Sequence, residues 1–521
     1  MAAGNWISFE GRKYVVAPGE RALDAMLRQG APVKFSCRKG TCRSCMLQAA
    51  SGDPGPEAVE RLPQDLRELG FFLPCCATNV DQVDAKTPDL SLCTHEAVLS
   101  EKTFAAPDIL VLKFELVNDT PWQAGQLIGL MNDAGDVRSY SIVSLKNDYL
   151  LEIHVRIYKD GKVSSWAADV LKTGQTVRFQ GPSGDFIYNA TNMADRPLVL
   201  VGTGTGAGVL FGLVRQALAD GHMAPIHLYL GGRKAQDLYL GDRLNLLPAD
   251  KVTIVQAASR EDVGGQPARR ITDVAFDEQK DLTESNLFIC GAPDMVETAR
   301  VRAMAAGASL DRIYADPFDA PEPYKTNEVA KLTSLKPDLE LWEALGKGQK
   351  LSVILNEFYT AVYEDPQLAP FFHRVTKQRA VEKQYNFLQD ILSGTKLYFG
   401  EKPFNAHHWM VISNELFDYR ERLFFNVVRR YGISEKLIHR WSAIHELFRR
   451  DIVKSAARGI LRDGEEVHLE GFTREKMDIA SVCDGCMEEI NAGDEVLMHS
   501  RTGEVFCVKC EAKDVEEEFA A

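Results

Sequence analysis

The order of apolar and polar residues changes character along the chain, and each change predicts a different kind of fold. Around residues 109–116 and 150–156, apolar and polar positions alternate, which predicts antiparallel strands of a small barrel. From Pro197 onward, apolar runs such as 198–202 are separated by helical stretches, the pattern of a parallel α/β sheet covered on both faces. Beyond a proline-rich stretch at 319–325, apolar residues recur every three or four positions, which predicts helices.

Length, charge and cysteine content narrow the range of functions. At 521 residues the chain is too long for one core, and a prior of ~150 residues per domain predicts three or four domains. The net charge of −14 argues against non-specific binding to nucleic acid or to an anionic membrane, because both need an excess of Lys and Arg. No leader with a basic start and no apolar run of about 18 residues is visible, so we expect a cytoplasmic protein without a membrane span. Eleven cysteines in that reducing compartment predict metal binding rather than disulfides.

The first group of cysteines has the spacing of a plant-type 2Fe–2S ferredoxin. Cys37, Cys42 and Cys45 form a C-x4-C-x2-C pattern, and Cys75 and Cys76 follow farther along. A short loop thus supplies three thiolates and a distant segment supplies the fourth, while loop amides hydrogen-bond the sulfurs. On spacing alone, the fourth ligand is Cys75 or Cys76.

This stretch resembles the ferredoxin module of aromatic-ring dioxygenase reductases, which is an α+β fold of the β-grasp type. The family reads Leu-x-Cys at this point, so Leu73-Pro74-Cys75 implies Cys75 as the fourth ligand. We interpret Cys76 and Cys93 as small buried apolar residues.

The middle of the chain resembles the ferredoxin–NADP reductase-like family through motifs that occur in the family's order. Arg138-Ser139-Tyr140-Ser141 resembles the flavin motif, in which the Arg neutralises pyrophosphate, the Tyr packs on the isoalloxazine and the Ser can hydrogen-bond flavin N5. A later Gly-x-x-Ser-Ser resembles the helix start that cradles the flavin pyrophosphate. The residues that the resemblance assigns to FAD are Arg138, Tyr140, Ser141, Gly161, Ser164 and Ser165.

The nicotinamide side carries a glycine loop and a Cys-Gly-x-x-x-Met loop. The glycine loop is not the dinucleotide fingerprint, because the next strand ends in Gly-Gly-Arg-Lys rather than in an acidic residue. In the family the thiol of the second loop lies beside the nicotinamide, which makes Cys290, together with Ser141, a candidate catalytic residue. Ser259-Arg260 resembles a clip for the 2′-phosphate of NADPH, whereas dioxygenase reductases use NADH, so the nucleotide is left open with NADH favoured. The residues assigned to the nucleotide are Gly202, Gly204, Gly206, Arg233 and Cys290.

Residues 355–372 closely resemble the second helix and following corner of truncated haemoglobins. The resemblance places Tyr359 and Gln384 on the distal side of a haem b, as candidate catalytic residues, and implies that Phe372 wedges the haem. Hydrogen bonds from Tyr359 and Gln384 to bound O2 would hold it tightly and suit its reaction with nitric oxide.

The proximal ligand of that haem is implied by a second part of the same resemblance. Residues 400–407 lead into Ile412-Ser413 with the spacing that the family uses around its proximal histidine. This implies His407 as the iron ligand, with the adjacent His408 as the rival.

The last four cysteines form two knuckles, Cys483-x2-Cys486 and Cys507-x2-Cys510. Four thiolates satisfy tetrahedral zinc without an open position, which indicates a structural site. Iron in a rubredoxin-like site is the alternative, although the Cys-Pro-x-Cys-Gly knuckle typical of that family is missing.

Together these patterns predict a multidomain electron-transfer protein. The predicted parts are a 2Fe–2S ferredoxin at 1–95, an antiparallel β-barrel FAD domain at 96–193, an α/β NAD(P)-binding domain at 194–318, a linker at 319–338, an all-α truncated globin at 339–455, a linker at 456–478 and a four-Cys zinc module with an acidic tail at 479–521. By analogy to flavohaemoglobins, an NAD(P)H-driven haem oxidoreductase that converts nitric oxide to nitrate with O2 is the leading hypothesis. The alternative is a reductase for a separate oxygenase, with the globin as an oxygen or redox sensor or an oxygen store. Sequence does not decide whether the cluster or the flavin reduces the haem.

Overall fold

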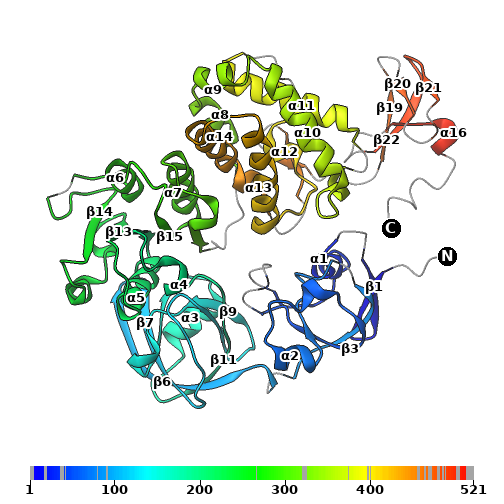
Figure 1. Cartoon of the computed structure of the whole chain (residues 1–521). Helices are drawn as coiled ribbons and strands as arrows, with labels where there is room; N and C mark the ends of the chain where they lie inside the picture. Colours follow the sequence, from blue (N-terminus) through cyan, green and yellow to red (C-terminus); the bar gives the residue numbers. More distant parts are fainter. Residues whose placement is uncertain are drawn as a thin grey trace.

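The computed structural model shows a ferredoxin domain, a two-part reductase, a helical globin and a small C-terminal module (Figure 1). The described residues are all except 1–4, 17–19, 36–39, 41–42, 79, 90–91, 266, 319–325, 373–374, 396–397, 399–400, 455–457, 463–464, 468–471, 478–480, 484–485, 487, 500–504 and 512–521. Among these residues, no helix combines the length and the apolar character needed to cross a membrane.

The ferredoxin domain is a five-stranded sheet in the order β2-β1-β5-β3-β4 with short helices. Strand β1 pairs antiparallel with β2 and parallel with β5, so the sheet is mixed. Helix α1 buries Ala22, Leu23, Ala25 and Met26 in the same apolar core as the strands. This is the α+β domain that the resemblance to the ferredoxin module of dioxygenase reductases implied. Its elements are β1 (Trp6–Phe9), β2 (Arg12–Val15), α1 (Ala22–Arg28), β3 (Leu47–Asp53), α2 (Gln64–Glu68), β4 (Phe71–Phe72) and β5 (Asp81–Lys86).

The FAD domain is an antiparallel sheet of six strands in the order β10-β7-β6-β11-β8-β9. The two alternating segments of the sequence form β7 and β10, as predicted. The described edge strands β9 and β10 are not joined by a continuous ladder, so the predicted barrel is not closed. The two edges approach at a single bridge between Ile142 and Ile153. The elements are β6 (His95–Ala106), β7 (Ile109–Leu116), β8 (Leu127–Met131), β9 (Val137–Ser141), β10 (Leu151–Arg156), α3 (Lys162–Asp169), β11 (Thr176–Ser183) and α4 (Ala190–Met193).

The nicotinamide lobe is a five-stranded parallel sheet in the order β14-β13-β12-β15-β16. Helix α5 and helices α6 and α7 belong to two different apolar clusters of this sheet, which explains why its strands are apolar throughout. The elements are β12 (Leu198–Thr203), α5 (Gly206–Ala219), β13 (Ile226–Gly232), β14 (Val252–Ala258), α6 (Ile271–Glu278), β15 (Asn286–Gly291), α7 (Pro293–Ala305) and β16 (Ile313–Pro317).

The globin is entirely helical, and Trp441, Phe358 and Phe424 are the largest side chains fully buried in its core. Part of the predicted linker 319–338 forms the first helix of this region. The helices are α8 (Glu328–Ser334), α9 (Leu339–Ala344), α10 (Gln349–Glu364), the short turn η7 (Ala369–Phe372), α11 (Lys377–Ser393), α12 (Pro403–Ala406), α13 (Asn414–Arg430), α14 (Glu435–Leu447) and α15 (Arg449–Ile452).

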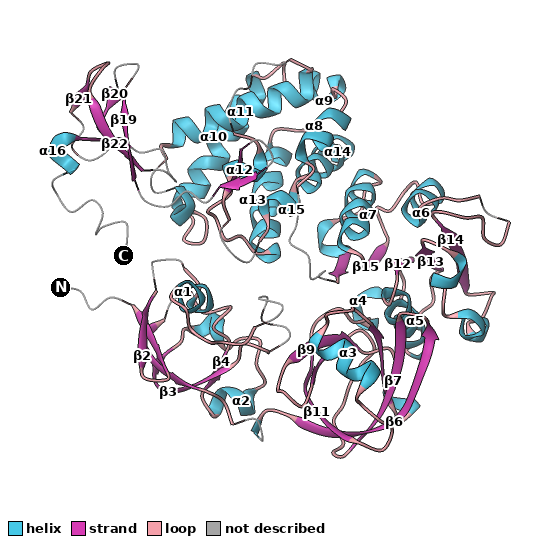
Figure 2. Ribbon diagram, turned by 180° about the vertical axis from the view of Figure 1, so that it is seen from behind, coloured by secondary structure: helices cyan, strands magenta, loops and turns pink. Residues whose placement is uncertain are grey.

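The globin packs directly on the nicotinamide lobe, through contacts between α14 and α7 (Figures 1 and 2). Ala443 of α14 belongs to the same apolar cluster as Val296 and Ala299 of α7. Beside it, Arg300 Nε donates to Glu446 Oε1 at 2.6 Å in a buried position. The globin is therefore a docked domain, held by apolar packing and buried charge.

The C-terminal module consists of short strands, part of which lie within the predicted linker 456–478. Strands β17 and β18 form an antiparallel hairpin, and β19, β22 and β23 form a three-stranded sheet. The elements are β17 (Ile460–Arg462), β18 (Glu465–Val467), β19 (Phe472–Lys476), β20 (Ser481–Val482), β21 (Glu489–Ile490), β22 (Glu495–His499), β23 (Val505–Cys507) and α16 (Val508–Glu511).

Candidate functional site

The junction between the FAD sheet and the nicotinamide lobe brings Ser141 and Cys290 to one carboxylate. Ser141 ends β9 and its Oγ donates to Asp316 Oδ2 at 3.4 Å. Cys290 lies one residue before the end of β15 and opposite Asp316 of β16 in the parallel register. Burial, and then the charge of Asp316, raises the pKa of Cys290 well above its usual value, so the group is a neutral thiol. Two residues chosen from separate motifs therefore meet at the edge where the strands end.

The glycine loop lies against the backbone of Cys290. A Cβ at Gly206 would lie 2.5 Å from the Cys290 carbonyl oxygen, and one at Gly202 would lie 2.6 Å from Leu210 Cδ1. Gly204 has a φ of +57°, in the left-handed region. Glycine thus occupies positions 202 and 206 because neighbouring atoms leave no room for a Cβ, and it occupies position 204 because the backbone there has a positive φ.

A buried polar network ties the glycine loop to the FAD sheet. His154 of β10 lies with Nδ1 2.7 Å from Tyr239 Oη, which also accepts the Gly208 amide at 3.1 Å. The other ring nitrogen of His154 is 2.7 Å from Glu152 Oε1, and Arg243 Nη1 donates to the same oxygen at 2.5 Å. Burial raises the pKa of Glu152, but the hydrogen bonds from His154 and Arg243 outweigh this effect and lower the pKa to about 2. The network links the two lobes through side chains to which the motifs assign no cofactor.

The residues assigned to phosphate groups range from the buried Ser164 to the exposed Arg138 and Arg233. Gly161 caps α3, and the hydroxyls of Ser164 and Ser165 hydrogen-bond the backbone of the loop before it. Arg138 on β9 and Arg233 after β13 are both exposed, so their guanidinium groups can reach an anionic ligand. Tyr140, between Arg138 and Ser141, is half-buried, and burial raises its pKa.

Of the cysteines assigned to the 2Fe–2S cluster, Cys45 and Cys75 are buried in the ferredoxin core. Cys37 and Cys42 lie outside the described residues. Cys76 is half-buried, with its sulfur 3.8 Å from that of Cys75. The choice of Cys75 over Cys76 as the fourth ligand stays a prediction.

The ferredoxin contacts both the FAD sheet and the globin. Lys34 Nζ donates to the Gly135 carbonyl oxygen at 2.7 Å, in the turn that leads into β9. On another side, Arg61 Nη2 lies 3.5 Å from Glu415 Oε1, in the first turn of globin helix α13. Arg61 also borders the cysteine loop, because a Cβ at Gly40 would lie 3.0 Å from its Cδ. The described residue Gly40 of this loop thus lies beside Arg61, the residue that contacts the globin.

On the distal side of the globin, the three predicted residues lie together. Tyr359 of α10 is buried, and its Oη donates to Gln384 Oε1 of α11 at 2.7 Å. The ring of Phe372 lies edge-on to Tyr359, with centroids 5.6 Å apart. Burial raises the pKa of Tyr359 to about 12, so the hydroxyl stays protonated and can donate a hydrogen bond.

On the proximal side, His407 and His408 have similar local geometry. His407 Nδ1 lies 2.9 Å from the Pro403 carbonyl oxygen, and His408 Nδ1 lies 2.7 Å from the Asn405 carbonyl oxygen. A proton on Nδ1 leaves Nε2 as the ligating atom in either ring. Burial is the main cause that lowers the pKa of His407 to about 4, which keeps its imidazole in the neutral form that binds iron. His407 as the ligand stays a prediction, and its surroundings fit the role.

Cations around His407 were missed by sequence reasoning. Arg420 of α13 places its guanidinium 4.8 Å from the ring of Phe358, and its charge lowers the pKa of both Tyr359 and His407. Lys454 donates from Nζ to the His407 carbonyl oxygen. Because a haem carries two carboxylates, this positive surrounding fits it. Arg420 is a cation among the apolar positions of α13, and this place in the pattern could have marked it as a candidate. No pattern in the sequence pointed to Lys454.

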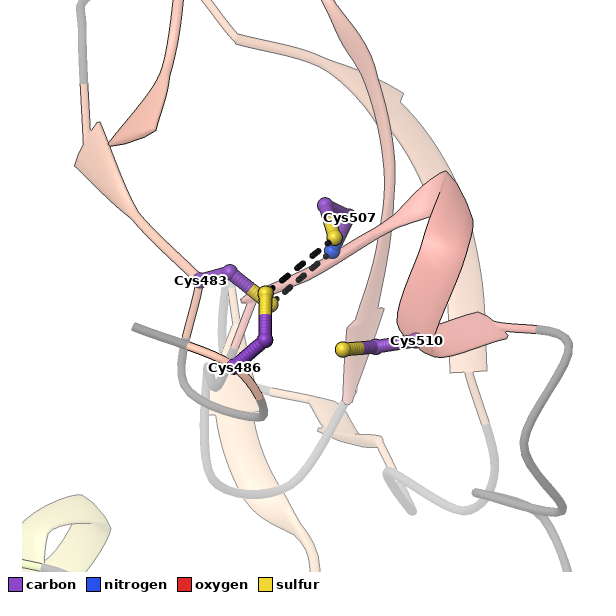
Figure 3. Close-up of side chains that lie close together, drawn as sticks. All are labelled: Cys483, Cys486, Cys507 and Cys510. Atoms are coloured by element: carbon purple, nitrogen blue, oxygen red, sulfur yellow. Dashed lines mark hydrogen bonds between the residues drawn. The ribbon is translucent and has the colours of Figure 1, made fainter. Parts of the chain in front are cut away.

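The four C-terminal cysteines converge as predicted (Figure 3). Their sulfur atoms all lie within 4.8 Å of one another, and the Cys507 amide donates to Cys483 Sγ at 3.3 Å. Zn–S bonds of about 2.3 Å place sulfurs about 3.8 Å apart in a tetrahedron, so the cluster suits a four-thiolate metal. Cys483 and Cys510 are buried, whereas Cys486 is exposed.

Comparison with family profiles divides the chain in the same order. The 2Fe-2S iron-sulfur cluster binding domain matches residues 7–79, and the oxidoreductase FAD-binding domain matches 96–188. The oxidoreductase NAD-binding domain matches 200–301, and the bacterial-like globin matches 340–452. A 2Fe–2S cluster, FAD, a nicotinamide nucleotide and haem are thus the cofactors of these domains.

Two curated relatives align with the first three domains. The reductase subunit of an aromatic O-demethylase from Amycolatopsis is 31% identical over 330 residues, which cover 60% of this chain and 98% of the relative. A ferredoxin–NAD(P)(+) reductase component of naphthalene 1,2-dioxygenase/salicylate 5-hydroxylase systems from Ralstonia is 30% identical over 316 residues, covering 58% and 94%. The chain belongs to this family of reductase components.

The reductase therefore is an NAD(P)H-dependent flavin and iron–sulfur oxidoreductase, extended by a globin and a four-cysteine module. Among solved structures, an Amycolatopsis cytochrome P450 reductase is similar with 28% identity and a TM-score of 0.44, over 61% of this chain and 100% of that one. The globin implies that the reductase also binds O2.

Proposed function

We propose that this chain is an NADH- or NADPH-driven haem oxidoreductase in which electrons pass by way of FAD and the 2Fe–2S cluster to the globin haem. Its reaction would convert nitric oxide to nitrate, with one electron, one nitric oxide and one O2 giving one nitrate. FAD supplies the change from hydride to single electrons, and haem supplies the site for O2.

The observation that carries the proposal is that the ferredoxin contacts both the FAD sheet and the globin. The bond from Lys34 to Gly135 sits at the turn before the flavin strand, and the pair of Arg61 with Glu415 sits at the start of α13. Arg61 also lies beside Gly40, a described residue of the cysteine loop, and Lys34 precedes that loop in the sequence. This supports the cluster, rather than the flavin, as the donor to the haem.

The chain's own residues would then divide the work. Arg138 would hold the flavin pyrophosphate, Ser141 would hydrogen-bond the flavin, and Cys290 would orient the nicotinamide. In the globin, His407 would ligate the iron. Tyr359, kept protonated by burial, would turn its hydroxyl from Gln384 Oε1 and donate a hydrogen bond to the haem ligand.

Stopped-flow spectroscopy of the anaerobic holoprotein mixed with NADH or NADPH tests the proposal. The haem Soret band should shift to the ferrous position at a rate independent of dilution, because donor and acceptor are in one chain. Arg61→Glu should slow this step, since it places like charges at the contact with Glu415. Lys86→Glu, an exposed cation on strand β5 of the same domain, is the matched control and should leave the rate unchanged.

A second function is favoured by the names of the relatives, which are reductase components of oxygenase systems. In that case the globin would sense or store oxygen, and the ferredoxin would reduce a separate oxygenase. A haem that stays ferric while added cytochrome is reduced rapidly would favour this function and reject intramolecular reduction.

We also propose that the C-terminal cysteines hold one structural zinc ion. The four cysteine sulfurs fill all four coordination positions of a tetrahedral zinc ion, so the site has no open position for a substrate. Elemental analysis should find one zinc per chain, and a fourth iron in its place would reject zinc.

A further inference from the structure

The chain that follows the last globin helix turns back over the segment containing His407 and His408. The Lys454 amide donates to the Ile412 carbonyl oxygen at 3.0 Å, and the Arg458 amide donates to the His408 carbonyl oxygen at 2.9 Å. Both donors lie beyond residue 452, where the globin match ends. The proximal segment is therefore covered by chain that is not part of the matched globin.

Side chains strengthen this contact at its two ends. Lys454 Nζ donates to the His407 carbonyl oxygen. Asn405 forms a paired contact with Leu461, donating from Nδ2 to its carbonyl oxygen at 3.1 Å and accepting its amide on Oδ1 at 2.8 Å. The described residues of 454–462, here called the proximal strap, thus hold the backbone from Asn405 to Ile412.

The strap also brings positive charge to the proximal side. The guanidinium of Arg458 lies 3.5 Å from the centre of the Phe404 ring, three residues before His407. Lys454 reaches the peptide that follows His407. Because ferric haem carries one more positive charge than ferrous haem, cations at this position disfavour the ferric state.

We propose that the proximal strap positions His407 and that Lys454 and Arg458 raise the reduction potential of the haem. They are positioning residues, which act through the proximal segment and through the local field. The sign is the same if either cation pairs with a haem carboxylate, since neutralising that charge also favours ferrous iron. The inference rests on the proposed role of His407 as the iron ligand.

The test uses the full-length holoprotein and its apoprotein. Burial, and then the charge of Arg458, lowers the pKa of Lys454 to about 7, so the measurement is made at pH 6, where the ammonium group is charged. There Lys454→Met should lower the midpoint potential in spectroelectrochemistry, with a roughly tenfold shift toward ferric haem, or ~59 mV for a one-electron couple. Lys454→Arg keeps the charge and should restore most of the potential. Arg462→Met removes an exposed cation from the same strap and should change nothing.

A second measurement tests the contact between the strap and the proximal segment independently of the reduction potential. Asn405→Ala should raise amide hydrogen exchange across residues 404–412 of the apoprotein several-fold, and should shift the iron–histidine stretching band of the ferrous holoprotein. An unchanged potential in Lys454→Met, together with unchanged exchange in Asn405→Ala, would overturn the inference. The assignment of His407 as the iron ligand fails separately if His407→Ala keeps the wild-type haem spectrum, and the proposed function fails separately if NADH and NADPH leave the haem ferric.

Discussion

Glu446 is predicted to hold the globin on the nicotinamide lobe. Its side chain is 1% exposed and accepts from Arg300 Nε at 2.6 Å and from Arg449 Nε at 2.7 Å. Burial raises the pKa of Glu446, but the charges of Arg300 and Arg449 outweigh this effect and lower the pKa. The carboxylate is therefore ionised at neutral pH. Glu446→Ala would leave two guanidinium groups, 10% and 6% exposed, without this counter-charge.

Removing one partner of a buried ion pair costs about 3–5 kcal/mol. Asp418 lies 3.8 Å from Arg300 and also pairs with Arg449, so it offsets part of the loss. We therefore expect Glu446→Ala to cost about 3 kcal/mol, at the lower end of that range. The cost should appear mainly as a weaker association between globin and reductase.

Urea unfolding of the full chain, followed in parallel by haem absorbance and flavin fluorescence, measures this effect. In the wild type the two signals should change together, and in Glu446→Ala the globin signal should move to lower urea. Glu435→Ala is the matched control, because Glu435 is 56% exposed in its pair with Arg429 and should cost at most ~1 kcal/mol.

A Glu446→Ala cost as small as that of the control would refute the reasoning, since the buried network would then carry no docking energy. The double variant Arg300→Met/Glu446→Met offers a second check. It removes both charges at similar volume and should recover most of the lost stability.

Three further predictions concern the globin and the tail. Tyr359→Phe should speed O2 dissociation about 2- to 10-fold in flash photolysis, because one hydrogen bond of about 0.5–1.5 kcal/mol is lost. Burial raises the pKa of Glu421, but the charges of His445 and Arg420 outweigh this effect and lower the pKa to about 2, below its value in the unfolded chain. Its stabilisation is therefore complete above about pH 5 and is lost as the pH falls toward 2, and Glu421→Gln should remove that part of the acid-unfolding curve. Cys486→Ser should abolish zinc retention in elemental analysis while leaving the flavin and haem spectra unchanged.

Short-range patterns in the sequence predicted much of the candidate site. The spacing of Cys483 with Cys486 and of Cys507 with Cys510 allows four sulfurs to meet once two short knuckles face each other. Likewise Ser141 and Cys290 could be named because each lies in a short motif that resembles one of the reductase family, and the fold brings both close to Asp316. The spacing around His407 and His408 predicted a proximal segment and favoured His407 over His408 as the iron ligand, and that choice stays a prediction.

The sequence by itself determined the kinds of domain in this chain, because apolar period and cysteine or glycine spacing act over a few residues or a single turn. Only the tertiary structure revealed the open FAD sheet, the docking of α14 on α7 and the strap over the proximal histidines. Each of these depends on groups distant in sequence, such as Arg300 with Glu446 or Lys454 with His407. A lone charged residue carries no mark of its future partner, since burial and complementary charge arise only when the folded surfaces meet.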